Sequence, residues 1–142
     1  MVRVIMHGCN GRMGQVITEM IAKEAEMEIV AGVDVSDSVH NTYPVFKTLK
    51  DCDVEADVVI DFANAKAVDG LLDVCVERNL PCVLCTTGLS EEQLAHVKEA
   101  SGKVAILRSA NMSMGINLLM KLLKDAVPVL AAADYDMEIV EK

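Results

Sequence analysis

Two kinds of hydrophobic pattern alternate along this chain. Short apolar runs rich in β-branched residues occur at Val2–Met6, Glu28–Val33 and Asp57–Phe62, and such runs are typical of buried strands. Between the first two runs, Arg12–Glu24 carries apolar side chains at a spacing of three or four residues, which is typical of an amphipathic helix. These segments predict a βαβ unit followed by a further parallel strand.

The same alternation continues to about residue 130. Expected strands lie at Pro81–Cys85 and Lys103–Leu107, and expected helices lie at Lys66–Arg78, Ser90–Ala100 and Ser113–Leu130. Strands that alternate with helices favour a parallel sheet covered on both faces. We therefore expect an α/β fold, a doubly wound Rossmann-type parallel sheet, with a dinucleotide-binding domain over residues 1–130.

The pattern is weaker in two places. Between residues 36 and 53 we expect only a short strand at Pro44–Phe46 and a helical turn at Thr48–Cys52. Near the end, Pro128 is expected to bend or end the last helix, and Tyr135–Val140 resembles the beginning of a strand. We expect residues 131–142 to begin a truncated substrate domain. Five apolar residues of the last helix are expected to be buried: Ile116, Leu119, Met120, Leu122 and Leu123.

Composition excludes several classes of partner. Thirteen basic residues against twenty-two acidic ones give a formal net charge of −9, which repels nucleic acid and anionic lipid. No stretch without charge is longer than the 12 residues of Ser109–Met120, and a membrane-spanning helix needs roughly 20. The N-terminus does not resemble a signal peptide. We expect a cytoplasmic protein with no nucleic-acid or membrane partner.

Cysteine usage supports the same compartment. Five cysteines are an odd number, which favours reduced thiols over a disulfide framework. Cys82 and Cys85 have the spacing of a redox or zinc pair, but an offset of three within a strand places two side chains on opposite faces of the sheet. We expect both to be buried small residues, and we expect no metal site.

A glycine-rich segment follows the first expected strand. Gly8, Gly11 and Gly14 are three residues apart and open into a helix, where the absence of side chains lets backbone N–H groups approach a pyrophosphate. Asp34 ends the second strand, 20 residues after Gly14, which is where dinucleotide folds place the acid that binds the adenosine ribose. The alternative is a tight turn with a solvated acid. Arg12 is either a pyrophosphate contact or a surface cation.

Four motifs extend this interpretation, and they occur in the order Gly8–Gly14, Val59–Phe62, Cys85–Gly88 and Ala110–Asn117. In this order they resemble the 4-hydroxy-tetrahydrodipicolinate reductase (dihydrodipicolinate reductase) family over essentially the whole chain. The resemblance implies hydride transfer from NADH or NADPH to a cyclic dicarboxylate intermediate of lysine and diaminopimelate synthesis, in a homotetramer. The candidate cofactor-binding residues are Gly8, Cys9, Asn10, Gly11, Arg12, Met13, Gly14, Asp34, Phe62, Thr86, Thr87, Gly88, Asn111 and Met112.

The chain departs from the family pattern in two respects. Met112 stands where the family commonly has an aromatic residue. The chain also ends before the paired histidines and the serine-glycine-threonine loop of the family, so we assign no catalytic residue. We expect these 142 residues to bind NADH without reductase activity and, since the family's substrate domain holds the tetramer, to form a monomer or weak dimer. His7, His40 and His96 are expected to be structural or exposed, and Asp61 to be a turn or cap acid.

The preferred cofactor is read from the residues that follow Asp34. Val35, Ser36 and Asp37 add a second carboxylate and no cation, so we expect NADH to be favoured over NADPH. NADPH binding would require a cation from elsewhere, with Arg12 the first candidate. Two other functions remain open: a different nicotinamide-dependent enzyme, such as an amino-acid dehydrogenase, and a non-catalytic dinucleotide-binding module.

Overall fold

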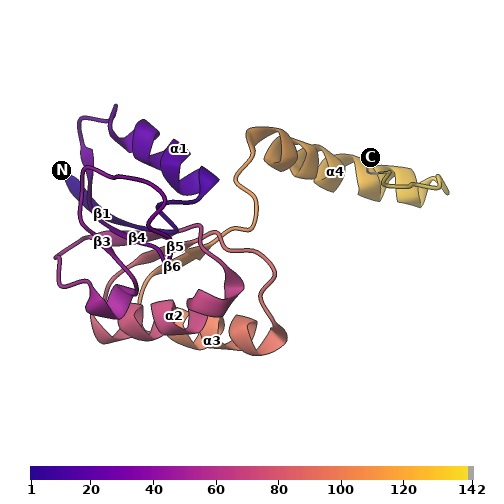
Figure 1. The fold of residues 1–142 in the computed structure, drawn as a ribbon. Coiled ribbons are helices and arrows are strands. Elements are labelled where there is room, and N and C mark those ends of the chain that lie inside the picture. Colours follow the sequence, from indigo (N-terminus) through magenta and orange to yellow (C-terminus); the bar gives the residue numbers. More distant parts are fainter. Residues whose placement is uncertain (141–142) are drawn as a thin grey trace. The chain divides into compact units, whose positions relative to one another are not determined.

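A six-stranded parallel sheet forms the centre of the protein in a computed structural model that describes residues 1–140 (Figure 1). The strand order is β3-β2-β1-β4-β5-β6, and every neighbouring pair is parallel. This order confirms the expected doubly wound sheet. The strands are β1 (Val2–His7), β2 (Met27–Val33), β3 (Val45–Phe46), β4 (Val58–Asp61), β5 (Cys82–Leu84) and β6 (Ile106–Arg108).

Helices cover both faces of this sheet. Figure 1 shows α1 on one face and α2 and α3 together on the other, as right-handed crossovers between parallel strands require. The helices are α1 (Arg12–Ile21), α2 (Val68–Glu77), α3 (Glu91–Ser101) and α4 (Met114–Ala132), with 3₁₀ turns η1 (Leu49–Asp51) and η2 (Ala65–Ala67). The sheet with α1, α2 and α3 makes one compact unit, Met1–Ala110, and a second unit, which contains α4, begins at Asn111. The expected domain boundary after residue 130 stays a prediction.

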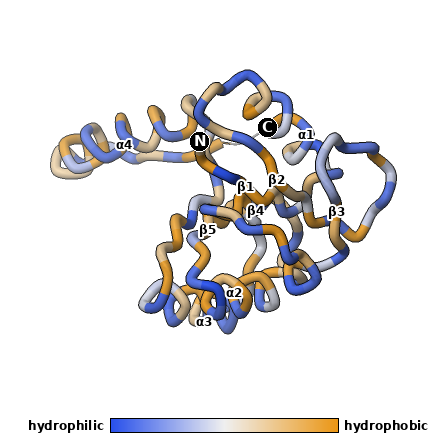
Figure 2. Tube along the Cα trace, turned by 90° about the vertical axis from the view of Figure 1, so that its left-hand side faces the viewer, coloured by the Kyte–Doolittle hydropathy of each residue, from blue (hydrophilic) through white to orange (hydrophobic). Residues whose placement is uncertain are grey.

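The central strands carry the core. Val4, Ile5 and Val59 of β1 and β4 are fully buried. Leu72 of α2, which also has no exposed surface, belongs to the same hydrophobic cluster as Ile5 and Val59. Figure 2 shows hydrophobic residues concentrated along β1, β4 and β5. Strands that are buried on both faces have continuous apolar sequences, and such runs are recognisable in the sequence.

Local signals set several element ends. Ser90 and Gln93 form the expected capping box at the start of α3, with each side chain bonded to the other's backbone N–H. The expected strand at Lys103–Leu107 begins later, at Ile106. Backbone N–H groups of Lys103 and Val104 donate to the carbonyl of Ala100 instead, so these residues close the turn after α3.

The second unit differs from two expectations and decides between the alternatives of a third. Pro128 lies inside α4, so of the two expected effects it does not end the helix. The five residues expected to be buried, Ile116, Leu119, Met120, Leu122 and Leu123, are all at least 38% exposed. Tyr135–Val140 forms no strand within the described residues. Within its own unit, α4 is the only described helix and has no buried residue, so its apolar face has no partner layer there. A strand likewise needs a neighbour to receive its hydrogen bonds.

Candidate dinucleotide site

The carboxyl ends of β1 and β4 meet at the middle of the sheet. The strand order reverses between these two strands, because the chain moves outward through β2 and β3 on one side and through β5 and β6 on the other. Their last residues, His7 and Asp61, are partners in register. Ligands of open α/β sheets bind at this switch point, beyond the carboxyl ends of the strands.

The glycine loop turns sharply away from β1. Gly8 has a φ of +82°, and its N–H donates to the carbonyl of Val33 at 2.8 Å. A Cβ on Gly8 would lie 2.8 Å from the backbone carbonyl of Phe62, the residue that follows β4. The loop therefore needs glycine twice over, for its positive φ and for its contact with the neighbouring loop.

The other two glycines have different roles. A Cβ on Gly14 would lie 2.2 Å from the carbonyl oxygen of Gly8, so Gly14 lets α1 pack against the loop. A Cβ on Gly11 would lie 3.3 Å from that same oxygen, which a small shift accommodates. Gly11 is the N-cap of α1 and has no side chain to cap the helix, and free N–H groups at a helix N-terminus favour an anion.

The side chains of the loop mostly hold its own conformation. Cys9 is fully buried, where burial and, to a lesser extent, the Asp34 charge raise the pKa of its thiol to about 11. The amide nitrogen Nδ2 of Asn10 donates to the carbonyl of Ser36 at 2.6 Å. Arg12 and Met13 begin α1 and are exposed. Among the polar side chains of the loop, Arg12 is therefore exposed and Asn10 is half-buried.

Asp34 ties the end of β2 to this loop. Its Oδ2 accepts the backbone N–H of Asn10 at 2.9 Å, and its Oδ1 accepts the backbone N–H of Ser36 at 2.8 Å. A carboxylate offers about four acceptor positions, so two bonds leave capacity for ribose hydroxyls. Asp34 therefore does hold the turn, as the alternative from the sequence analysis stated, and it keeps acceptor positions for a ligand.

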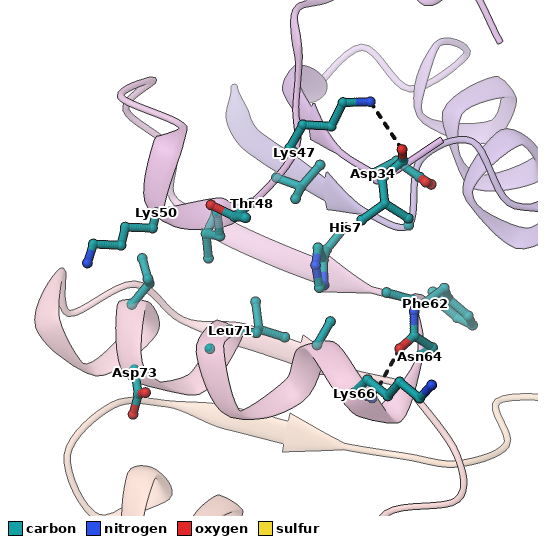
Figure 3. Close-up of a pocket in the computed structure, with 18 of the residues that line it drawn as sticks. His7, Asp34, Lys47, Thr48, Lys50, Phe62, Asn64, Lys66, Leu71 and Asp73 are labelled. Atoms are coloured by element: carbon teal, nitrogen blue, oxygen red, sulfur yellow. Dashed lines mark hydrogen bonds between the residues drawn. The ribbon is translucent and has the colours of Figure 1, made fainter. Parts of the chain in front are cut away.

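A cavity of about 640 Å³ opens at the carboxyl edge of the sheet (Figure 3). Four of the candidate cofactor residues line it: Gly8, Gly11, Asp34 and Phe62. His7, Lys47, Thr48, Lys50 and Lys66 line it as well, together with residues of α2. The volume falls in the range of small-molecule sites. The lining combines the surface of α2 with cations from two segments, the one after β3 (Lys47 and Lys50) and η2 (Lys66).

His7 and Asp61 form a buried pair that the sequence analysis did not foresee. His7 Nδ1 lies 2.6 Å from Asp61 Oδ1, and the same oxygen accepts the backbone N–H of Ala63. Asp61 is fully buried and His7 is 7% exposed. Asp61 is thus a turn acid, as expected, and also joins the loops after β1 and β4. The pair could have been predicted only if the pairing of β1 with β4, and of their last residues, had been known.

The remaining candidates lie elsewhere. Thr86 is buried, whereas Thr87 and Gly88 are exposed, in the loop that leaves the carboxyl end of β5. This loop belongs to the ligand-binding edge but does not line the cavity. Asn111 and Met112 begin the second unit, where Asn111 Oδ1 accepts the N–H of Ser113. Their participation in a cofactor site stays a prediction.

Residues 1–140 contain no group of three or more His, Cys, Asp or Glu side chains that is arranged to hold a metal ion. None of the helices there has both the length and the apolar character needed to cross a bilayer. The five cysteines are all buried, which agrees with the expectation for Cys82 and Cys85.

A doubly wound sheet with a glycine loop, a helix N-terminus and an acid at the next strand end defines a dinucleotide-binding class of domain. A family profile described as "Dihydrodipicolinate reductase, N-terminus" matches residues 2–112. The chain therefore belongs to the dihydrodipicolinate reductase family.

Individual relatives agree with that family. The chain is 49% identical to a 4-hydroxy-tetrahydrodipicolinate reductase of Caldanaerobacter subterraneus subsp. tengcongensis over its whole length, and 46% identical to one of Clostridium tetani. Each match covers 55% of the relative, so the chain spans about half the length of these curated relatives.

A solved structure shares the fold. A dipicolinate-bound dihydrodipicolinate reductase from Paenisporosarcina sp. TG-14 superposes with a TM-score of 0.78 at 27% identity. The match covers 89% of this chain and 54% of that one. The fold expected from the sequence is thus confirmed by the strand order and by a solved relative.

Proposed function

We propose that this chain binds a nicotinamide dinucleotide and supplies the cofactor half of a 4-hydroxy-tetrahydrodipicolinate reductase. In this proposal, the protein containing the chain transfers a hydride from the reduced cofactor to a tetrahydrodipicolinate-type dicarboxylate of lysine and diaminopimelate synthesis. The observation that carries it is the cavity at the switch point, with Gly8 and Gly11 on one side and Asp34 on another. Membership of the family supports the same chemistry.

The residues of the cavity fit such a cofactor. The pyrophosphate would lie at the N-terminus of α1, where Gly11 leaves room and the helix dipole favours negative charge. Asp34 would accept hydrogen bonds from the adenosine ribose through its remaining acceptor positions. Phe62 would contact the cofactor from the loop after β4. The bound reduced nicotinamide supplies the hydride, so these residues serve to bind and orient it.

The other candidate residues complete the proposal. The turn of Thr86, Thr87 and Gly88 would lie beside the nicotinamide and the substrate. The family resemblance adds Asn111 and Met112 as further cofactor-binding residues of the proposal. The printed description of the Paenisporosarcina relative names dipicolinate as its ligand, which supports a small dicarboxylate substrate. The proton donor and the groups that hold the substrate carboxylates are assigned to none of these 142 residues.

Cofactor preference, assembly and location are part of the same proposal. We propose that NADH is favoured over NADPH, because Asp34 and Asp37 repel a 2′-phosphate. By itself the 142-residue chain is proposed to be a monomer or weak dimer, a state that sedimentation would test. Buried reduced cysteines and an excess of acidic residues support a cytoplasmic protein without nucleic-acid partners.

The test of dinucleotide binding uses two glycine substitutions. Gly11→Val places a branched side chain in the cavity, and we expect it to lower NADH affinity at least about tenfold while the protein stays folded. Gly102→Val is the matched control, because a Cβ there also lies 3.3 Å from a carbonyl oxygen, that of Glu99, and Gly102 is outside the cavity. Calorimetric titration measures both. Equal NADH affinity in both variants would contradict the proposed site.

A further inference from the structure

Lys47 brings a cation to the ribose end of the cavity from a part of the chain where the sequence predicted only a weak strand. β3 pairs with β2, with Val33 opposite Phe46. The backbone N–H of Asp34 continues the pairing by donating to the carbonyl of Phe46 at 2.9 Å. Asp34 and Lys47 are therefore the first residues beyond two neighbouring strands, at the same edge of the sheet.

The ammonium group of Lys47 is held by the segment that follows Asp34. Nζ donates to the carbonyl of Val35 at 3.1 Å and forms an ion pair with Asp37 Oδ1. Lys47, Asp34 and Val35 line the cavity, whereas Asp37 does not. One side chain thus contacts both the cavity and an acid outside it.

The pair is solvated and therefore easily exchanged. The side chains of Lys47 and Asp37 are 54% and 81% exposed, and ion pairs of such exposure contribute little to stability. Lys47 could leave Asp37 for a stronger anion at low cost. A phosphate with up to two negative charges is such an anion, and the group that distinguishes NADPH from NADH is a 2′-phosphate on the ribose.

We propose that Lys47 determines how the site treats the 2′-substituent of the adenosine ribose, and that Asp37 controls its availability. While Asp37 neutralises Lys47, the two acids and one cation at this corner keep a net negative charge, which favours a 2′-hydroxyl. Without Asp37, the same lysine binds a 2′-phosphate. This inference rests on the proposed dinucleotide function, and it replaces Arg12 with Lys47 as the cation that admits NADPH.

The other cations of the cavity provide a contrast. Lys50 and Lys66 also line it, and Figure 3 draws both well away from Asp34. Lys50 lies three residues after Lys47 in the sequence. Replacing it removes one positive charge from the cavity lining, as replacing Lys47 does. Lys50→Met is therefore the matched control for Lys47→Met.

The test compares NADH and NADPH affinities of the wild type, Asp37→Asn, Lys47→Met, the double variant and Lys50→Met by calorimetric titration. We expect Asp37→Asn to strengthen NADPH binding about threefold to fivefold, as an exposed charge pair allows, with a smaller change for NADH. Lys47→Met should weaken NADPH binding by a similar factor, and the double variant should lose the gain of Asp37→Asn. Only the NADPH gain should weaken steeply with salt.

A fragment separates this inference from the function on which it rests. Adenosine 2′,5′-bisphosphate carries the 2′-phosphate without the nicotinamide, and adenosine 5′-monophosphate lacks that phosphate. The same Lys47-dependent difference is expected between these two fragments. If the wild type binds NADH but Lys47→Met and Lys50→Met change NADPH binding equally, the role of Lys47 is wrong and the proposed function stands. If neither dinucleotide binds, both the proposed function and this inference are wrong.

Discussion

His7 and Asp61 end two neighbouring strands, with Nδ1 of the imidazole 2.6 Å from Oδ1 of the carboxylate. Both are buried, and Asp61 also holds the backbone of Ala63. The pair thus connects the loop after β1, which contains Gly8, to the loop after β4. Because a Cβ at Gly8 would strike Phe62, these two loops are in contact. The part of the cavity lined by Gly8, Phe62 and Ala63 depends on this connection.

Removing the carboxylate from this pair should destabilise the fold. We expect Asp61→Asn to lower the free energy of unfolding by about 2 kcal/mol, the scale for a buried hydrogen bond with an ionisable group. Urea denaturation measures the change. Asp53→Asn is the control, because it makes the same chemical change at an exposed position. A similar loss in both variants would mean that the contact between His7 and Asp61 contributes little.

Two helical glycines should respond to alanine in opposite directions. At Gly14 of α1 the added Cβ meets the carbonyl oxygen of Gly8 at 2.2 Å, so we expect Gly14→Ala to cost about 3 kcal/mol, at the upper end for overpacking. At Gly70 of α2 nothing lies within 4 Å, so Gly70→Ala should raise stability by about 0.5–1 kcal/mol. Thermal or chemical denaturation distinguishes the two. If Gly14→Ala were as stable as the wild type, the glycine loop and α1 would have to be further apart in solution than they are in this structure.

Acid should weaken the fold through Asp57. The hydrogen bonds and charge of Arg3 lower the pKa of Asp57 to about 2, and that carboxylate accepts from the Arg3 guanidinium at 2.9 Å. A carboxyl whose pKa is lower in the folded state contributes stability above its unfolded pKa and loses it as the pH falls through the folded value. The loss is therefore expected between about pH 4 and pH 2.

The variant Asp57→Asn isolates this contribution. Its stability should depend less on pH in that window than the stability of the wild type, as followed by urea denaturation at several pH values. Asp53→Asn again serves as the exposed control. If Asp57→Asn and the wild type lose stability in parallel as the pH falls, the contact with Arg3 does not operate in solution.

Much of the fold could be predicted because its signals are local. The buried strands are continuous apolar runs, and the Ser90 capping box needs only residues that are close in sequence. Other features depend on distant partners. The end-to-end pairing of His7 with Asp61 and the approach of Lys47 to Asp34 require the strand order β3-β2-β1-β4, which no local pattern contains. The apolar residues of α4 are exposed, although they were expected to be buried, for the same reason. An apolar face in a sequence does not indicate which element packs against it.

The candidate site divides along the same line. That Gly8, Gly11 and Asp34 lie together at one edge of the sheet was predictable, because spacing along a βαβ unit fixes their positions. Their role in binding a cofactor stays a prediction. The reasons for the three glycines could not be separated by sequence, since the clash at Gly14 and the room at Gly11 appear only when the loop is folded.

The central claim, a dinucleotide site at the switch point, is tested most directly by mapping amide chemical shifts of the isotopically labelled chain during titration with NADH. We predict that the largest changes fall on Gly8, Gly11 and Asp34, at the carboxyl edge of the sheet. The hollow near Arg3 and Arg78 at the opposite edge should be unaffected. Saturating NADH that leaves Gly8, Gly11 and Asp34 unshifted, or that shifts the Arg3 edge instead, would contradict the account.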